Sequence, residues 1–323
     1  MSEQSATQVL RSVRFVKMKT SEFALPAVIL LIFVGTGLAE PRFVSAANAA
    51  NLASQIAPLL ILSIGQAVAI IGGGIDLSLA SVMSLAGVVG ALAMHQWGVP
   101  VGTAVMVTTG LLTGSISGII IAYLRTTPLI VTLGMMSITQ AVALILANGV
   151  PIYDLPESFT STIGFGTVDG IPATALIGAG LLLAIWAVLR RTVFGRYLYA
   201  IGSNRSAAEK SGIDVALHTM LAYAISGMCA GIAGVVMTAW TSAAQPVAEP
   251  TLTLQSLAAV VLGGVALTGG SGGMIHVVYG VLILGLLANA MNLLGISAYY
   301  QILAVGVVII LAVVLDRLRH RAG

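Results

Sequence analysis

Residues 77–124 decide the fold class, and they read LSLASVMSLAGVVGALAMHQWGVPVGTAVMVTTGLLTGSISGIIIAYL. This stretch contains no Asp, Glu, Lys or Arg. Because a membrane-spanning helix needs about 20 apolar residues, it predicts two spans. Residues 43–75 and 250–315 are equally free of charge and predict about two and three more. The pattern is typical of an all-α polytopic membrane protein.

The composition of the whole chain supports this class. Of 323 residues, 58% are hydrophobic and 8% are charged, and the mean hydropathy is +1.04. A soluble domain carries about 25% charged residues, so most of this surface must face something other than water. The net charge of +3 is no nucleic-acid footprint. One cysteine, Cys229, and four histidines without ligand spacing predict neither a disulfide nor a metal or cofactor site.

We expect ten membrane spans. They are placed at residues 23–39, 52–71, 77–96, 101–122, 128–147, 173–189, 216–238, 254–267, 274–294 and 298–315. Residues 23–39 follow a basic segment as in a signal peptide, but with so many later spans an uncleaved signal anchor is the better interpretation. Ten spans put every Lys and Arg except Arg42 on the side that both ends share. The positive-inside rule therefore makes both termini cytoplasmic.

This topology divides the chain into a cytoplasmic segment 1–22, a transmembrane domain 23–316 and a cytoplasmic tail 317–323. The longest outward loop, 148–172, carries three acidic residues and no basic residue, and a second outward loop covers 241–253. Both could receive an external partner, or they could be ordinary solvated connectors.

The longest inward loop covers residues 190–215. Within it, Ser206 and Glu209 fit a capping box and Gly212 fits a helix stop, which predicts a helix of about two turns. A helix so short is not stable alone in water. Either the membrane domain or a docked partner must hold it.

Two glycine-rich breaks, residues 72–78 and 262–273, interrupt apolar sequence. They could line a transport path, but our topology favours tight turns at the inner side. We expect Asp76 at this boundary, where its carboxyl would accept from backbone donors near Leu79 or Ala80. The turn and cap residues are Gly73, Gly74, Asp76 and Ser78.

Neutral polar residues recur inside the predicted spans, and they could hydrogen-bond the hydroxyls of a neutral solute. They could equally link neighbouring helices, which we favour for any single one. The candidates for a translocation path are Gln66, Gln140, Gln255, Asn289 and Asn292. Two glycine stripes, at 110, 114 and 118 and at 227, 231 and 234, predict close helix packing.

Several activities lack their motifs. No G-x-x-x-x-G-K-[ST] occurs, so we expect ATP hydrolysis, if any, on a separate subunit. Residues 269–273 match G-x-S-x-G, but without the strand context that an intramembrane hydrolase needs. An ion-coupled transporter would need ionisable groups within the membrane, and Asp76 is the single candidate inside an apolar stretch.

Several motifs together resemble the ribose/xylose-type sugar permeases of ATP-binding cassette (ABC) importers. They are GGIDLS (73–78), PLIVTLG (128–134), FGRY (194–197), AIGSN (200–204) and VVLGG (260–264). The resemblance covers about residues 50–316 and implies a type II-like importer permease in a bacterial inner membrane. It also implies a second permease subunit, identical or a sister chain, a cytoplasmic cassette ATPase, an external solute-binding protein and surrounding lipid.

The same resemblance implies that residues 204–212 form the coupling helix that docks on the ATPase. Its members here are Asn204, Ser206, Ala207, Ala208, Glu209 and Gly212. The implied mechanism is alternating access, in which closure of the ATPase rocks the two permease subunits. Leu79-Ala80 replaces the usual valine-glycine, and the glycine segment near 270 lacks a common arginine. The solute therefore stays open, and a non-sugar solute such as an amino acid is the alternative.

Overall fold

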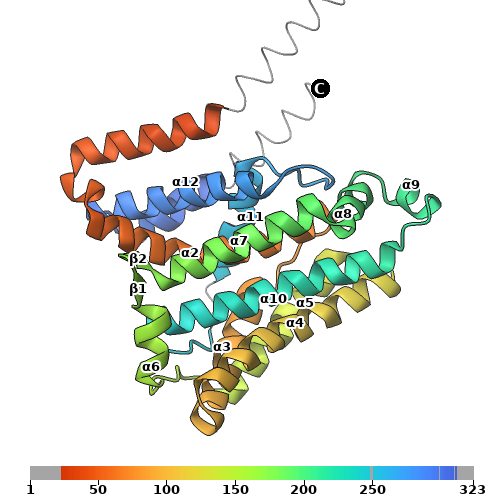
Figure 1. Cartoon of the computed structure of the whole chain (residues 1–323), viewed down its shortest axis with the longest axis horizontal. Coiled ribbons are helices and arrows are strands. Elements are labelled where there is room, and N and C mark those ends of the chain that lie inside the picture. The colour runs from red at the N-terminus through yellow and green to blue at the C-terminus, as the bar shows by residue number, and fades with distance from the viewer. Residues whose placement is uncertain (1–22, 248–249, 298, 309, 311–323) are drawn as a thin grey trace, which may run out of the picture.

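The computed structural model describes residues 23–247, 250–297, 299–308 and 310, and these form one bundle of helices (Figure 1). The predicted terminal segments 1–22 and 317–323 lie outside the described residues, as does the end of the last predicted span.

Helices account for nearly all of the described secondary structure. The elements in chain order are a helix Phe23–Ala39, η1 Pro41–Val44, α2 Ala46–Ile71, α3 Leu79–Trp97, α4 Val99–Tyr123, α5 Pro128–Leu146, α6 Glu157–Phe159, η2 Thr160–Gly164, β1 Thr167–Val168, β2 Ile171–Pro172, α7 Ala173–Arg191, α8 Val193–Ser203, α9 Arg205–Lys210, α10 Val215–Thr241, α11 Pro250–Gly263, α12 Met274–Leu293 and a helix Tyr299–Val308. The strands β1 and β2 form one antiparallel hairpin.

Seven helices among the described residues are long and apolar enough to cross a membrane, namely α2, α3, α4, α5, α7, α10 and α12. Each coincides with a predicted span, so a helical, multi-pass membrane protein is confirmed. Three shorter apolar helices, Phe23–Ala39, Thr251–Gly263 and Tyr299–Val308, lie at the remaining three predicted positions. The count of ten crossings and the side of the termini stay predictions.

Side-chain oxygens fix where several helices begin. Ser45 accepts from the backbone N–H of Asn48 at the start of α2, and Asp214 accepts from that of Leu217, 2.9 Å away, at the start of α10. A cap of this kind satisfies one of the donors that the first helical turn leaves free. The glutamate before η1, Glu40, pairs with Arg42 at 2.8 Å. This guanidinium lowers the pKa of the Glu40 carboxyl to about 2.

Helices α2, α3 and α10 form the centre of the bundle. The most apolar stretches of α2 and α3 are each 78% buried and that of α10 is 67% buried, against 22% for α5 and α7. Figure 1 shows α10 between α7 on one side and α4 and α5 on the other. The peripheral helices leave large apolar side chains exposed, as expected for surfaces that face lipid or another subunit.

The two predicted glycine stripes pack against each other. Gly110 and Gly114 on α4 meet Gly227 and Gly231 on α10, where an added Cβ would overlap with backbone atoms of the opposite helix. Glycine allows this approach because it has no side chain to hold the backbones apart. The predicted role of the stripes is confirmed.

Candidate functional site

The loop 190–215, predicted to face inward, folds into two helices, α8 and α9, that lie at one end of the bundle (Figure 1). Asn204 caps α9, because its Oδ1 accepts from the backbone N–H of Ala207 at 2.9 Å. The predicted capping box of Ser206 and Glu209 is therefore wrong. Asn204 lies three residues before Ala207, which is the spacing that an N-cap bond requires. Helix α9 therefore begins at Arg205, and Ser206 lies inside it.

The end of α9 agrees with its predicted stop. Gly212 has a φ of +81°, its N–H donates to the carbonyl of Glu209, and Ile213 N–H donates to that of Ala208. These two bonds make a Schellman motif, which favours glycine at this position. Ala208 is buried with Ile201 and Val215, so α9 is held by its own membrane domain through one small side chain.

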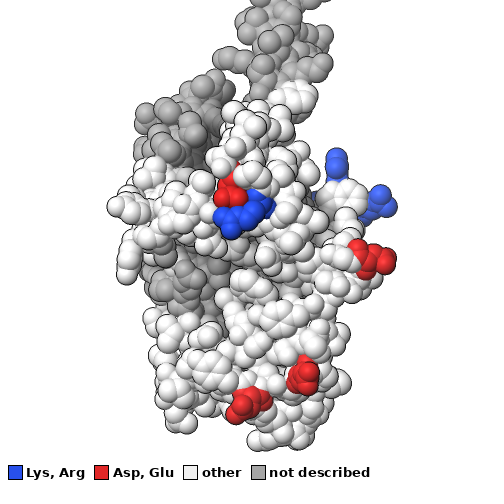
Figure 2. Space-filling view, turned by 90° about the vertical axis from the view of Figure 1, so that its left-hand side faces the viewer, with Lys and Arg blue, Asp and Glu red and all other residues white. Residues whose placement is uncertain are grey.

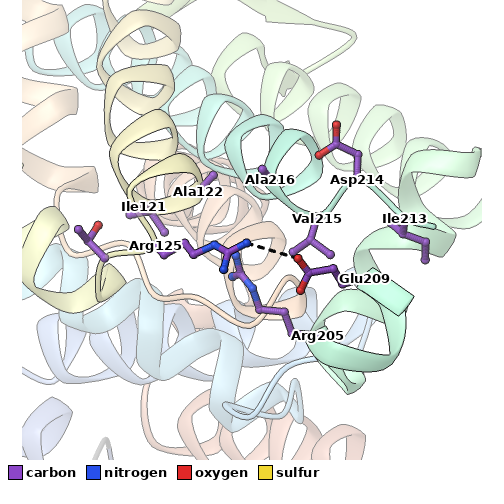
Figure 3. Close-up of a pocket in the computed structure, with 10 residues that line it drawn as sticks. Ile121, Ala122, Arg125, Arg205, Glu209, Ile213, Asp214, Val215 and Ala216 are labelled. Atoms are coloured by element: carbon purple, nitrogen blue, oxygen red, sulfur yellow. Dashed lines mark ion pairs between the residues drawn. The ribbon is translucent and has the colours of Figure 1, made fainter. Parts of the chain in front are cut away.

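The remaining side chains of α9 face solvent, and one of them reaches the neighbouring α4–α5 turn. Glu209 lies 3.5 Å from Arg125 of that turn, and both side chains are more than half exposed. Figure 3 shows this ion pair at a cleft of about 440 Å³, whose lining also includes Arg205 and Asp214. An exposed pair of this kind adds little stability, so these charges remain available to a partner.

The predicted path residues do not gather in one place. Asn289 and Asn48 exchange two hydrogen bonds, of 2.9 and 3.1 Å, which tie α12 to α2 as the linking role requires. Asn292 is exposed near the end of α12. Gln66 is fully buried in α2, and within the described part of the chain its amide atoms have no hydrogen-bond partner.

Gln255 and Gln140 lie at or beside two neighbouring cavities. Gln255 lines a cavity of about 320 Å³ between α2, α10, α11 and α12. Gln140 donates a hydrogen bond to the carbonyl of Pro246, in the segment that lines a second cavity of about 280 Å³. Met237 and Leu252 line both cavities, so they form a shared wall.

Neutral polar groups line these two cavities, and none of the described lining residues is charged. The first has Gln55, Gln255 and Gln301, and the second has Ser84, Thr238, Thr241 and Gln245. The sequence reasoning missed most of these because it singled out amides within spans. The spacing of Thr238 and Thr241, three residues apart near the end of α10, was the signal that could have found these two.

Asp76 is buried inside the bundle. Its carboxyl accepts from the backbone N–H and the hydroxyl of Ser78, at 3.0 and 2.6 Å, and from the hydroxyl of Ser226 at 2.8 Å. Ser226 lies 11 residues into α10, about 16 Å from its start. The predicted bonds to Leu79 or Ala80 are therefore wrong, because Ser78 and Ser226 supply the donors instead. The position of Asp76 at the membrane boundary stays a prediction.

The two loops that are predicted to face outward lie side by side. Ile152 and Ala244 exchange backbone hydrogen bonds of 3.1 and 2.9 Å, which join residues 148–172 to the segment after α10. Phe159 of the first loop is fully buried and packs against α3, α4 and α10. Figure 2 shows this face with scattered acidic groups and one adjoining acidic and basic pair. The loops form one ordered surface.

Comparison with known proteins places the chain in a family. The family model described as "Branched-chain amino acid transport system / permease component" matches residues 48–313. The ribose import permease protein of Escherichia coli (strain K12) is 36% identical, over 91% of this chain and 92% of the relative.

Two further relatives from that strain transport other sugars by name. The D-allose and L-arabinose transport system permease proteins are 34% and 32% identical, each over 93% of this chain and 92% of the relative. No solved structure matches the chain. The seven apolar helices and the match over residues 48–313 agree, and the chain belongs to the family of transport-system permease components that these sugar ABC permeases represent.

Proposed function

We propose that this chain is the membrane-spanning permease subunit of an ATP-driven, binding-protein-dependent importer of a sugar. It works in a bacterial inner membrane, beside a second permease subunit, with ATP hydrolysis on a separate cassette ATPase. The names of its relatives support a ribose-like pentose or a hexose as the solute. A solute other than a sugar is the alternative that the family description keeps in view.

The observation that carries the sugar proposal is the chemistry of the two cavities. Their amides and hydroxyls can exchange hydrogen bonds with a solute that carries several hydroxyls. A zwitterionic amino acid would bring two charges, and buried charges need charged or strongly polar partners. The described lining offers no such charge, so it suits a neutral polyol better than an amino acid.

Two surfaces suit the partners of such a permease. Helix α9 presents Arg205, Ser206 and Glu209 to solvent at one end, where we propose that the ATPase docks. The joined outward loops lie at the other end, where we propose that the solute-binding protein delivers the sugar. Movement of α9 would then alternate access to the path between the permease subunits.

Uptake measurements test the solute. A host strain without this chain should lose uptake of at least one radiolabelled sugar among ribose, allose, arabinose and xylose, and keep uptake of leucine.

Replacing Gln255 with Ala should lower uptake about two- to tenfold, since a lost hydrogen bond of about 0.5–1.5 kcal/mol has that effect. The matched control is Asn292→Ala, an amide outside both cavities. Loss of leucine uptake with all four sugars unaffected would identify an amino-acid importer instead.

A further inference from the structure

The two glycine breaks, far apart in the sequence, meet at the end of helix α8. The first break follows α2, and the second lies between α11 and α12. The N–H of Gly270 in the second break donates to the carbonyl of Ile71, at the end of α2, over 2.9 Å. Gly202, the penultimate residue of α8, lies against both of them.

This contact depends on backbone approaching backbone. A Cβ added at Gly202 would overlap with the carbonyl oxygen of Ile71 and the amide nitrogen of Gly270. A Cβ added at Gly269 would lie 2.9 Å from the Cα of Gly73 and 3.1 Å from that of Gly202. Real Cβ contacts are not so short, so three separate segments touch here only because each places a glycine at the contact.

Side chains of α8 strengthen the junction on either side. The hydroxyl of Tyr199 donates to the carbonyl of Gly272 at 2.9 Å. Leu198 is fully buried and lies against Gly72. Helix α8 is thus fixed to both breaks by packing and hydrogen bonds. Its next residue, Asn204, is the cap of α9, so α9 has no flexible linker to α8.

From the junction a short path leads into the membrane domain. Two residues after Gly74, Asp76 is bonded to Ser226 of α10, and α3 begins at Leu79. The first turn of α3 is bonded to α11, because Ala80 N–H donates to the hydroxyl of Thr253 at 3.1 Å. Ser84, one turn further along α3, lines the second cavity.

We propose that Gly202, with the glycine breaks at 72–74 and 269–273, is the positioning junction that carries the movement of α9 to α3 and α11. A displacement of α9 turns α8, and α8 shifts both breaks together because it touches both. The start of α3 and the cavity at Ser84 then follow. The junction rests on the proposed function, in which an ATPase moves α9.

The test uses the complete importer, purified from its host through a tag on this chain and reconstituted in liposomes. Gly202→Ala should still recover the ATPase, because α9 presents an unchanged surface. Sugar uptake, and the stimulation of ATP hydrolysis by the binding protein, should fall about tenfold, within the range of about 5- to 150-fold typical of coupled sites. The matched control is Gly180→Ala on α7, where an added Cβ meets nothing within 4 Å.

The outcomes separate the junction from the importer proposal. If the wild-type chain recovers no cassette ATPase, the importer proposal fails. Scrambling residues 204–212 should abolish recovery of the ATPase, which tests the docking role of α9 alone. Gly202→Ala with wild-type uptake would overturn the junction.

A measurement on the wild-type junction covers the case in which Gly202→Ala does not fold. Spin labels at Trp97, near the outer end of α3, and at Leu294, after α12, are both exposed, and Cys229 is buried. Adding ATP and vanadate to the importer with Gly202 intact should change the distance between the labels. An unchanged distance in a complex that transports sugar would overturn the junction.

Discussion

Asp76 illustrates how far one residue can depend on partners distant in sequence. The pattern GGIDLS correctly indicates a turn. From the neighbouring residues alone, however, we expect Asp76 only to cap the helix that follows. The third partner, Ser226, lies 150 residues away and draws the carboxyl into the bundle. Nothing within residues 72–80 could show this, because the bond depends on how α10 packs.

Replacing Asp76 separates the hydrogen bonds from the shape of the side chain. Asp76→Ala should lower the stability of the purified protein by about 1–3 kcal/mol, since the buried N–H of Ser78 loses its acceptor. Asp76→Asn keeps an oxygen for Ser78 and should cost less. The midpoint of thermal unfolding, read from a thiol-reactive dye on the buried Cys229, checks this order. Equal midpoints for the two variants would contradict it.

At the scale of elements, sequence periodicity predicted more than sequence caps did. The long helices follow from apolar runs, and the glycine stripes predicted close packing of α4 and α10, although not that these two helices contact each other. The start of α9 did not follow, because Asn204 and Ser206 are both good capping residues and only the tertiary fold selects between them. The cavities also escaped prediction, since their hydroxyl side chains are common inside spans.

The glycine contact between α4 and α10 gives a prediction about packing. Gly227→Ala should destabilise the protein by about 1–3 kcal/mol, because the new methyl group overlaps with the carbonyl oxygen of Gly110. Gly134→Ala on α5 meets nothing within 4 Å and should be neutral or slightly stabilising. The fraction of monodisperse protein after graded heating, measured by size-exclusion chromatography, compares the two. Equal losses would show that the α4–α10 distance adjusts freely.

For the whole molecule, the distribution of charge predicts the orientation without any knowledge of packing. Arg42, the single basic residue that is predicted to face outward, forms an ion pair with Glu40, so it adds little net charge to that side. How the loops meet was beyond prediction. The pairing of Ile152 with Ala244 and the meeting of the glycine breaks join segments that no local pattern connects.

Helix α11 is short for a membrane-spanning helix, so the predicted ten-span topology depends on whether it crosses. Its 14 residues span about 21 Å, less than the hydrocarbon core of about 30 Å. A crossing here must be completed by the irregular segments on either side, which is tolerated where such backbone is buried in protein. Gly264 and Gly269, both with positive φ, let the chain after α11 pack in this way.

Labelling of single cysteines in a Cys229→Ala background decides whether α11 crosses the membrane. In intact cells an impermeant maleimide should label Ser161→Cys and Ser297→Cys, but Ser206→Cys and Ser271→Cys only after permeabilisation. All four positions are exposed. Because Ser271 follows α11 and Ser297 follows α12, labelling of Ser271 from outside would mean that α11 does not cross the membrane. Labelling of Ser206 from outside would instead invert the orientation and separate α9 from any cytoplasmic ATPase.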